Sequence, residues 1–382
     1  MTRQRNLTCQ SLLLTILLVA NAAHATKPAN RPQPQNPPVD VVIALDVSGS
    51  MSGLIESAKQ RLWDIVNEIG QAQPQPDLRL AIITYGNPAY GEQGGYVRID
   101  MPFTRDLDAV NQTLFSFGTD GGDEYVARAV HTAVNELEWS DVPDAMRVLF
   151  VAGNERADQD PLVQIRAATA AASRKGIVVN TLYCGRDGDA IVGGWQDVAT
   201  LTNGLFASID QDAAAVANVA TPMDDELARL NRALNDTYVA YGVEGDRYKQ
   251  NQLEQDENAA DMSMPSVASR AIAKAGALYR NTDWDLVDAA GSGVDIGALD
   301  TDELPEPLRD MKPAERKAFV ADLAQKRAAV SAEITQLGQQ RQDYIDKERA
   351  RLAASTEGLD TAIIEGIRNL AEEKGFSFEM QH

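Results

Sequence analysis

Apolar segments of two kinds alternate along the chain from Val39 to about Ile209. Val39–Leu45 is an unbroken apolar run of the kind that forms a buried strand, and Leu54–Ile69 carries apolar residues at helical spacing. Further strands are predicted at 78–85, 96–99, 147–152, 177–184 and 205–209, and further helices at 106–115, 124–137, 161–174 and 195–201. This alternation predicts an α/β fold with a doubly wound, mainly parallel sheet that has helices on both faces.

A short polar loop, Asp46-Val47-Ser48-Gly49-Ser50, lies between the first predicted strand and the first predicted helix. In doubly wound sheets, ligands bind beyond the carboxyl ends of the strands, which is where this loop is expected. One carboxylate and two hydroxyls at alternate positions of a tight loop can point at one centre, and such hard oxygen donors suit a magnesium-sized ion. The alternative is that these residues only form the turn and cap the helix.

This Asp-x-Ser-x-Ser sequence, entered from Val-Ile-Ala-Leu and left through Met51, closely resembles the metal-ion-dependent adhesion site of von Willebrand factor type A domains. The resemblance covers residues 39–220 and implies the Rossmann-like fold of that family. It also implies that Asp46, Ser48 and Ser50 bind a divalent cation, which would be Mg²⁺ or else Mn²⁺ or Ca²⁺. In the family, an acidic group of a protein partner completes the coordination of the cation.

The second loop of the resemblance is Phe117–Glu124, which is similar to the Gly-Gly-Asp variant of many bacterial family members. It places Asp123 where the family usually has a threonine ligand. Asp123 is therefore predicted to bind the cation directly or through water, or to cap the helix that Glu124 is expected to open. Thr119 lies a few residues too early and is a weaker candidate.

The third loop of the resemblance ends the strand with Gly153-Asn154-Glu155, where the family commonly has Thr-Asp-Gly. The amide oxygen of Asn154 can accept from metal-bound water, and Glu155 could supply a charge. Asp160, which precedes Pro161, is expected to cap a helix and is excluded from the site. Without a third carboxylate the cation would bind more weakly, and a cation-free relic of the site is the alternative.

The first 25 residues have the features of a signal peptide. Arg3 and Arg5 precede an apolar run at 12–20, and Ala23-His24-Ala25 fits the preference of signal peptidase. The run is shorter than the ~20 residues that a membrane span needs, and no later stretch is apolar enough. We therefore expect export to the periplasm or the medium. In the sequence, a proline-rich linker at 26–38 is expected to follow the signal peptide. Cys184 is then the only cysteine, and we expect a buried thiol.

Residues 221–311 have a mixed pattern of helical and loop segments, and a long charged helix is predicted at 312–352. In this helix, apolar residues recur every seven positions from Leu323 to Tyr344, although Arg327 and Arg341 interrupt a second stripe. The pattern favours a hairpin with a helix at 359–370. A weak coiled coil with a second chain is the alternative, so the protein is expected to be a monomer or a weak dimer through its helical tail.

The overall charge and the absence of catalytic motifs restrict the function. The formal net charge of −21 disfavours nucleic acid as a partner, because phosphate backbones would be repelled. The usual catalytic histidine, cysteine and serine patterns are missing, so we expect a protein-binding module for adhesion or assembly and not an enzyme. One alternative is an envelope scaffold that acts through its helical tail with a degenerate metal site. A hydrolase that uses Asp and Glu is less favoured.

Overall fold

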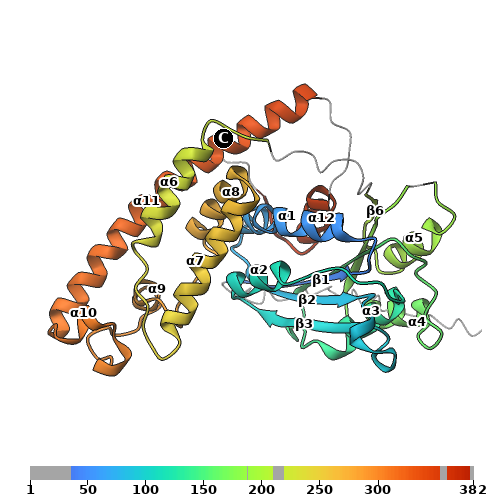
Figure 1. Ribbon diagram of the computed structural model, residues 1–382, viewed down its shortest axis with the longest axis horizontal. Coiled ribbons are helices and arrows are strands. Elements are labelled where there is room, and N and C mark those ends of the chain that lie inside the picture. Colours follow the sequence, from blue (N-terminus) through green and yellow to red (C-terminus); the bar gives the residue numbers. More distant parts are fainter. Residues whose placement is uncertain (1–35, 187, 210–218, 353–358, 379–382) are drawn as a thin grey trace, which may run out of the picture. The chain divides into compact units, whose positions relative to one another are not determined.

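A mainly parallel β-sheet forms the centre of the protein (Figure 1). The computed structural model describes residues 36–186, 188–209, 219–352 and 359–378, apart from the side chains of 349–352 and 359–362. Within these residues the sheet has six strands in the spatial order β3-β2-β1-β4-β5-β6. They are β1 (Pro38–Asp46), β2 (Asp77–Tyr85), β3 (Val97–Thr104), β4 (Met146–Gly153), β5 (Val178–Tyr183) and β6 (Phe206–Ser208). Only β3 is antiparallel, at the edge beside β2.

The central strand β1 is apolar from Val41 to Leu45, as expected for a strand that is covered on both faces of the sheet. Its side chains alternate between two cores, so that Val41 and Ile43 lie in one cluster while Val42 and Ala44 lie in the other. Helices α1 (Ser52–Gly70), α2 (Leu107–Phe115) and α12 (Leu359–Glu373) contribute to the first core. Helices α3 (Val126–Glu136), α4 (Ile165–Arg174) and α5 (Val192–Leu201) contribute to the second. The predicted doubly wound fold is confirmed.

The chain leaves the sheet after β6 and forms a helical region before it returns. This region contains α6 (Asp224–Asn235), α7 (Gly245–Met262), α8 (Met264–Ala275), α9 (Leu286–Gly291), α10 (Glu306–Arg309) and α11 (Pro313–Leu352). Three short 3₁₀ helices lie at Pro88–Tyr90, Glu92–Gly94 and Thr301–Glu303. Helix α7 was not predicted as a helix, because its buried face carries the polar residues Asn251, Gln252 and Gln255. A helical C-terminal region is confirmed.

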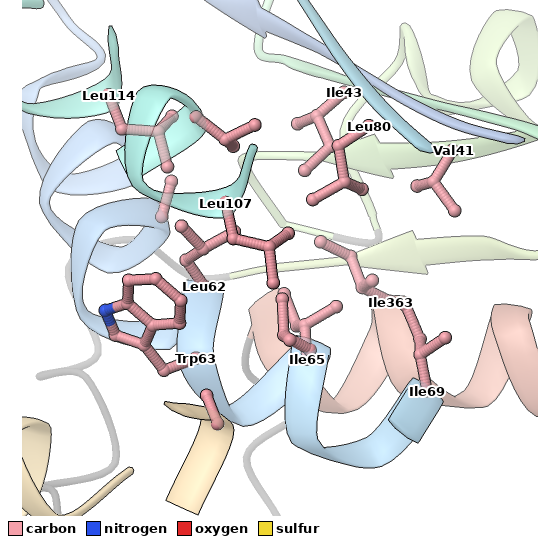
Figure 2. Close-up of a cluster of buried hydrophobic side chains, with 14 of the residues drawn as sticks. Val41, Ile43, Leu62, Trp63, Ile65, Ile69, Leu80, Leu107, Leu114 and Ile363 are labelled. Carbon is pink, nitrogen blue, oxygen red and sulfur yellow. The ribbon is translucent and has the colours of Figure 1, made fainter. Parts of the chain in front are cut away.

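The last helix, α12, does not pair with α11 as the expected hairpin. It contacts α1, β4 and β5 instead, and the side chains of Ile363 and Ile367 lie in the core under the sheet. Figure 2 shows Ile363 facing the same apolar cluster as Ile65 of α1. Two backbone hydrogen bonds of 2.8 Å between Gln73 and Ser377 fix the segment that follows α12. The sheet domain is therefore discontinuous, built from residues 38–209 and 359–378.

A buried guanidinium ties the helical region to the sheet domain. Arg270 of α8 is fully buried and donates hydrogen bonds to Asp108 of α2 (2.8 Å) and to Asp256 of α7. Its Cζ atom lies 4.7 Å from the centre of the Trp63 ring on α1. Because a buried charge needs partners, this arrangement fixes α8 against α1 and α2.

The two arginines that interrupt the apolar stripe of α11 are buried anchors. Arg327 donates to the carboxylates of Asp285 and Asp288 at 2.7 Å each. Arg341 donates to Asp224 at the start of α6, at 2.9 Å. In the heptad pattern these two arginines interrupt the apolar stripe. In the structure they attach α11 to the shorter helices beside it.

The predicted signal peptide and most of the predicted linker lie outside the described residues. In the part of the chain that the structure does describe, no helix is both long and apolar enough to cross a membrane. Cys184 is buried at the end of β5, and its burial raises the pKa of the thiol to about 12. It is therefore the unreactive thiol that the sequence predicts.

Candidate metal centre

The loop that carries Asp46, Ser48 and Ser50 lies at the carboxyl end of β1. Asp46 is fully buried, and its Oδ1 accepts a 2.8 Å hydrogen bond from the backbone N–H of Ser48. The hydroxyl oxygens of Ser48 and Ser50 lie 3.3 Å apart. Strands β2 and β4 flank β1 and lead to opposite sides, so this loop lies at the switch point where doubly wound sheets bind ligands.

The loop is not explained by helix capping. Helix α1 starts at Ser52, and the side chain of its N-cap residue Met51 makes no capping hydrogen bond. The short contacts of the loop are made inside it and to neighbouring loops. The two serine hydroxyls contact each other and the neighbouring loop.

The third loop brings Asn154 to the same place. Its Nδ2 donates a 3.0 Å hydrogen bond to the Ser50 hydroxyl, and its Oδ1 remains buried. The following residue, Glu155, is exposed, and its charge contributes to the raised pKa of Asp46. Asp160 lies away from the loop, where it accepts hydrogen bonds from the backbone at Leu162 and Val163 and pairs with Arg128.

The second loop supplies Glu124, which the sequence analysis did not include in the site. Asp123 is exposed and accepts a 3.4 Å hydrogen bond from the Tyr125 hydroxyl. It does not cap α3 either, because that helix begins at Val126 and its N-cap residue is Tyr125. The structure thus brings Glu124 next to Asp46 in place of Asp123. The Gly-Gly-Asp-Glu sequence holds two adjacent carboxylates, and only the turn geometry decides which one points inward.

The pKa values of Asp46 and Glu124 are both raised, and burial is the largest cause for each carboxyl. Burial raises the pKa of Asp46 to about 6, although the backbone N–H of Ser48 opposes the shift. Burial, followed by the charge of Asp46, raises the pKa of Glu124 to about 8. Two carboxylates in one buried place cannot both ionise cheaply, so the pair keeps a proton near neutral pH unless a positive charge is supplied.

Two glycines keep the space beside Asp46 free. Gly86 has a φ of +86°, and a Cβ atom there would lie 2.9 Å from Asp46 Oδ1 and 3.1 Å from Glu124 Cγ. A Cβ atom at Gly153 would lie 3.1 Å from Asp46 Oδ2 and 2.3 Å from the Tyr85 hydroxyl. The Tyr85 hydroxyl donates a hydrogen bond to the backbone oxygen of Ala152, which fixes the ring beneath the site. Any larger side chain at either glycine would fill the space at the carboxylate.

Three buried oxygen atoms in this place lack a hydrogen-bond donor among the described residues. They are Asp46 Oδ2, Glu124 Oε2 and Asn154 Oδ1. An acceptor that is buried without a partner costs roughly 1–3 kcal/mol, and more when it is charged. In the described ranges no group of three or more His, Cys, Asp or Glu side chains is placed to hold a metal. A cation here would therefore need hydroxyl and amide oxygens beside the two carboxylates, and such a set of hard oxygen donors fits Mg²⁺ or Ca²⁺.

Part of the chain matches a known family model. Residues 40–217, which include most of β1 and all of β2 to β6, match the model of the von Willebrand factor type A domain. No protein with a curated description matches the chain.

Several solved structures are similar to about half of the chain at low identity. Proximal thread matrix protein 1 of the mussel byssus, described with a zinc-occupied MIDAS motif, is 11% identical over 47% of this chain and 43% of its own, with a TM-score of 0.37. An aerotolerance-related membrane protein from Bacteroides fragilis is 19% identical over 46% of this chain and 96% of its own (TM-score 0.33). The pilus adhesin SpaC from Lactobacillus rhamnosus is 16% identical over 47% and 29% (TM-score 0.36). The chain spans less than half the length of the mussel protein.

Proposed function

We propose that the von Willebrand factor type A domain at residues 40–217 is a protein-binding module that depends on a divalent cation. The cation would be bound by the side chains of Asp46, Ser48, Ser50, Glu124 and Asn154. The observation that carries the proposal is the group of three buried oxygen acceptors that find no donor within the described part of the chain, at a place where two glycines keep space free. A positive charge at this position would satisfy all three.

Some of these residues would orient the groups that bind the cation, and others would supply its negative charges. Asp46 is oriented by the Ser48 backbone N–H, and Asn154 orients the Ser50 hydroxyl through its Nδ2. Glu124 adds the second negative charge from the neighbouring loop. When bound, Mg²⁺ would supply coordination positions held by exchangeable water, one of which a carboxylate of a protein partner can take.

The proposal extends to the setting of the protein. The N-terminal sequence favours export, so the module would act in the periplasm or outside the cell, in adhesion or in assembly of the envelope. We propose no catalysis, because the histidine, cysteine and serine patterns of common catalytic sites are missing from the sequence.

Cation binding can be measured on the intact purified protein by calorimetry, with Mg²⁺, Mn²⁺, Ca²⁺ and Zn²⁺ added after treatment with a chelator. Asp46→Asn and Glu124→Gln should each lower the affinity at least about tenfold, since even the partners of metal ligands contribute about 10–100-fold. Asp123→Asn is the matched control, because Asp123 is the exposed neighbour of Glu124. Equal losses in Glu124→Gln and Asp123→Asn would contradict the assignment of Glu124, and no heat with any cation would refute the metal site.

The alternative is a scaffold that binds its partner through the helical region. It is best tested without cutting the chain, because α12 completes the sheet domain and a truncation after residue 220 would remove it. Partner capture from an envelope fraction should require Mg²⁺ and fail in Asp46→Asn if the proposal holds. Capture that is insensitive to chelator and to Asp46→Asn would favour the scaffold.

A further inference from the structure

Two tyrosine side chains lie together next to the candidate metal centre. The ring centres of Tyr96 and Tyr125 are 5.6 Å apart, and the ring planes are tilted by 57°. Tyr125 directly follows Glu124 in the sequence. The backbone oxygen of Tyr96 accepts a 3.0 Å hydrogen bond from the N–H of Gly86, the glycine that lies beside Asp46. The same loops that form the metal centre therefore hold this tyrosine pair.

The tyrosine pair is not part of the packed interior. Both side chains are only partly buried, and in the part of the chain that the structure describes neither belongs to a hydrophobic core or to the apolar side chains packed against one. Tyr96 also has a φ of +56°, in the left-handed region that bulky side chains rarely adopt. Core packing does not explain a large aromatic residue at such a position, and strain of this kind is typical of functional sites.

Another tyrosine of the same loop already contacts a cation of the chain. The Cζ atom of Arg98 lies 4.2 Å from the ring centre of Tyr90. Within the described residues no lysine or arginine lies over the ring of Tyr96 or Tyr125 in this way. The aromatic faces of the pair are thus left to a cation that comes from outside the chain.

Two exposed carboxylates lie next to the tyrosine pair. Asp123 accepts a 3.4 Å hydrogen bond from the Tyr125 hydroxyl. Partial burial, followed by the charges of Glu92 and Asp123, raises the pKa of Tyr96, so both carboxylates are close to its hydroxyl. Aromatic faces beside carboxylates attract a positive charge.

The neighbouring cation Arg128 does not cancel this attraction. It lies against Gly95, which precedes Tyr96, but its guanidinium is bound by both carboxylate oxygens of Asp160 at 3.0 and 3.1 Å. The charge of Arg128 is therefore already balanced, and the surroundings of the pair are negative.

We propose that the tyrosine pair binds a basic side chain, Lys or Arg, of the same protein partner whose acidic residue reaches the metal centre. The inference rests on the proposed function and adds the chemistry of the partner. Because Tyr125 is adjacent to Glu124 and an extended residue covers about 3.3 Å, the basic residue of the partner would lie about one to three positions from its Asp or Glu.

The charge of the whole protein favours a partner of this kind. A chain with a net charge of −21 repels a purely acidic segment and attracts a basic one. A segment that carries both signs would be steered by its basic residue to the surface where the cation then binds its carboxylate.

The test uses random peptides displayed on phage, which are selected on the intact protein in Mg²⁺ and eluted with chelator. These peptides should carry Lys or Arg one to three positions from Asp or Glu. In the synthesised peptides, replacement of the basic residue by norleucine should weaken binding about 2–30-fold, which is the range for one cation–π contact. This measurement leaves the protein itself unaltered.

Variants of the protein assign the effect to the tyrosine pair. Tyr96→Leu should weaken the basic peptides by a similar factor and leave the norleucine peptides unaffected. Tyr96→Phe is the matched control, because it keeps the aromatic face and should bind the basic peptides as well as the unaltered protein does. Asp123→Asn should also weaken them. The Mg²⁺ affinity measured by calorimetry should stay unchanged in all three variants, since neither residue is a proposed ligand of the cation.

The outcomes separate the inference from the function on which it rests. Chelator-eluted peptides without an enriched basic residue, or basic peptides that bind Tyr96→Leu as well as the unaltered protein, would overturn the inference and leave the proposed function standing. Basic peptides that depend on Tyr96 but bind equally in chelator would refute the metal-dependent function and the joint use of both sites. A selection that yields no chelator-eluted peptide would count against both in the same way.

Discussion

The position of α12 against the sheet makes a strong prediction for Ile367→Ala. Ile367 is 1% exposed and lies in the core shared with α1 and the sheet. Each buried methylene contributes about 0.8 kcal/mol. With the cavity that remains, removal of such a side chain usually costs about 2–5 kcal/mol. We expect a fall of this size in the free energy of unfolding measured with urea. Melting temperatures of domains of 150–250 residues fall about 2–4 °C per kcal/mol, so melting should occur roughly 4–20 °C lower.

Two further variants of the same helix decide whether the reasoning holds. Asn369 is exposed, so Asn369→Ala should change the stability by no more than about 0.5 kcal/mol. Gly366→Ala would stabilise a free helix by about 1 kcal/mol. Against the sheet, however, its Cβ would lie 2.7 Å from Asn180 Nδ2 and 3.1 Å from Phe150 Cε1, and it should destabilise. A stabilising Gly366→Ala together with a neutral Ile367→Ala would show that α12 does not pack on the sheet.

Three other predictions concern the ion network and the metal centre. Arg270→Met removes the cation that pairs with the buried Asp108 and leaves Asp256 with Lys274 alone, so urea denaturation should show a loss of about 3–5 kcal/mol; a loss below 1 kcal/mol would contradict the network. Gly153→Ala should lower Mg²⁺ affinity at least tenfold by calorimetry. Gly49→Ala should leave the Mg²⁺ affinity unchanged, because a Cβ atom there meets nothing within 4 Å. Equal effects of the two variants would argue against a role for the space that Gly153 keeps free beside Asp46. Because the pKa values of Asp46 and Glu124 are raised to about 6 and about 8, the folded state binds more protons than the unfolded state between about pH 4 and 8. The chelator-treated protein should therefore lose stability as the pH rises through this window, and excess Mg²⁺ should abolish the loss; the opposite slope would refute the raised values.

The sequence predicted the sheet well because strands that are buried on both faces form long apolar runs. The same physics located the loop with Asp46, since a polar turn between a buried strand and an amphipathic helix can only lie at the sheet edge. The strand β3 was predicted to end at Ile99, although it continues to Thr104. As an edge strand it is only partly buried, so its apolar signal fades earlier.

The errors arose where distant contacts decide the structure. Asp123 and Glu124 are adjacent and chemically alike, and the loop between α2 and α3 brings Glu124, not Asp123, beside Asp46. The apolar stripe of α12 was correctly predicted, but such a stripe does not show which surface the helix packs against. The closer candidate in sequence was α11, whereas the true surface is formed by β4, β5 and α1. The buried face of helix α7 is polar and packs against polar partners such as Asn111, which donates to Gln255. The periodicity of apolar residues cannot detect a helix of this kind.

The return of the chain to its first domain has a consequence for biogenesis. Arg368 bonds to Glu68 across 300 residues of sequence, and the surface that α12 covers stays bare until that late segment has been made. Such distant closure slows folding. A nascent chain would therefore carry an open hydrophobic patch from the completion of β5 until α12 has been made, which is the condition under which holdase chaperones bind.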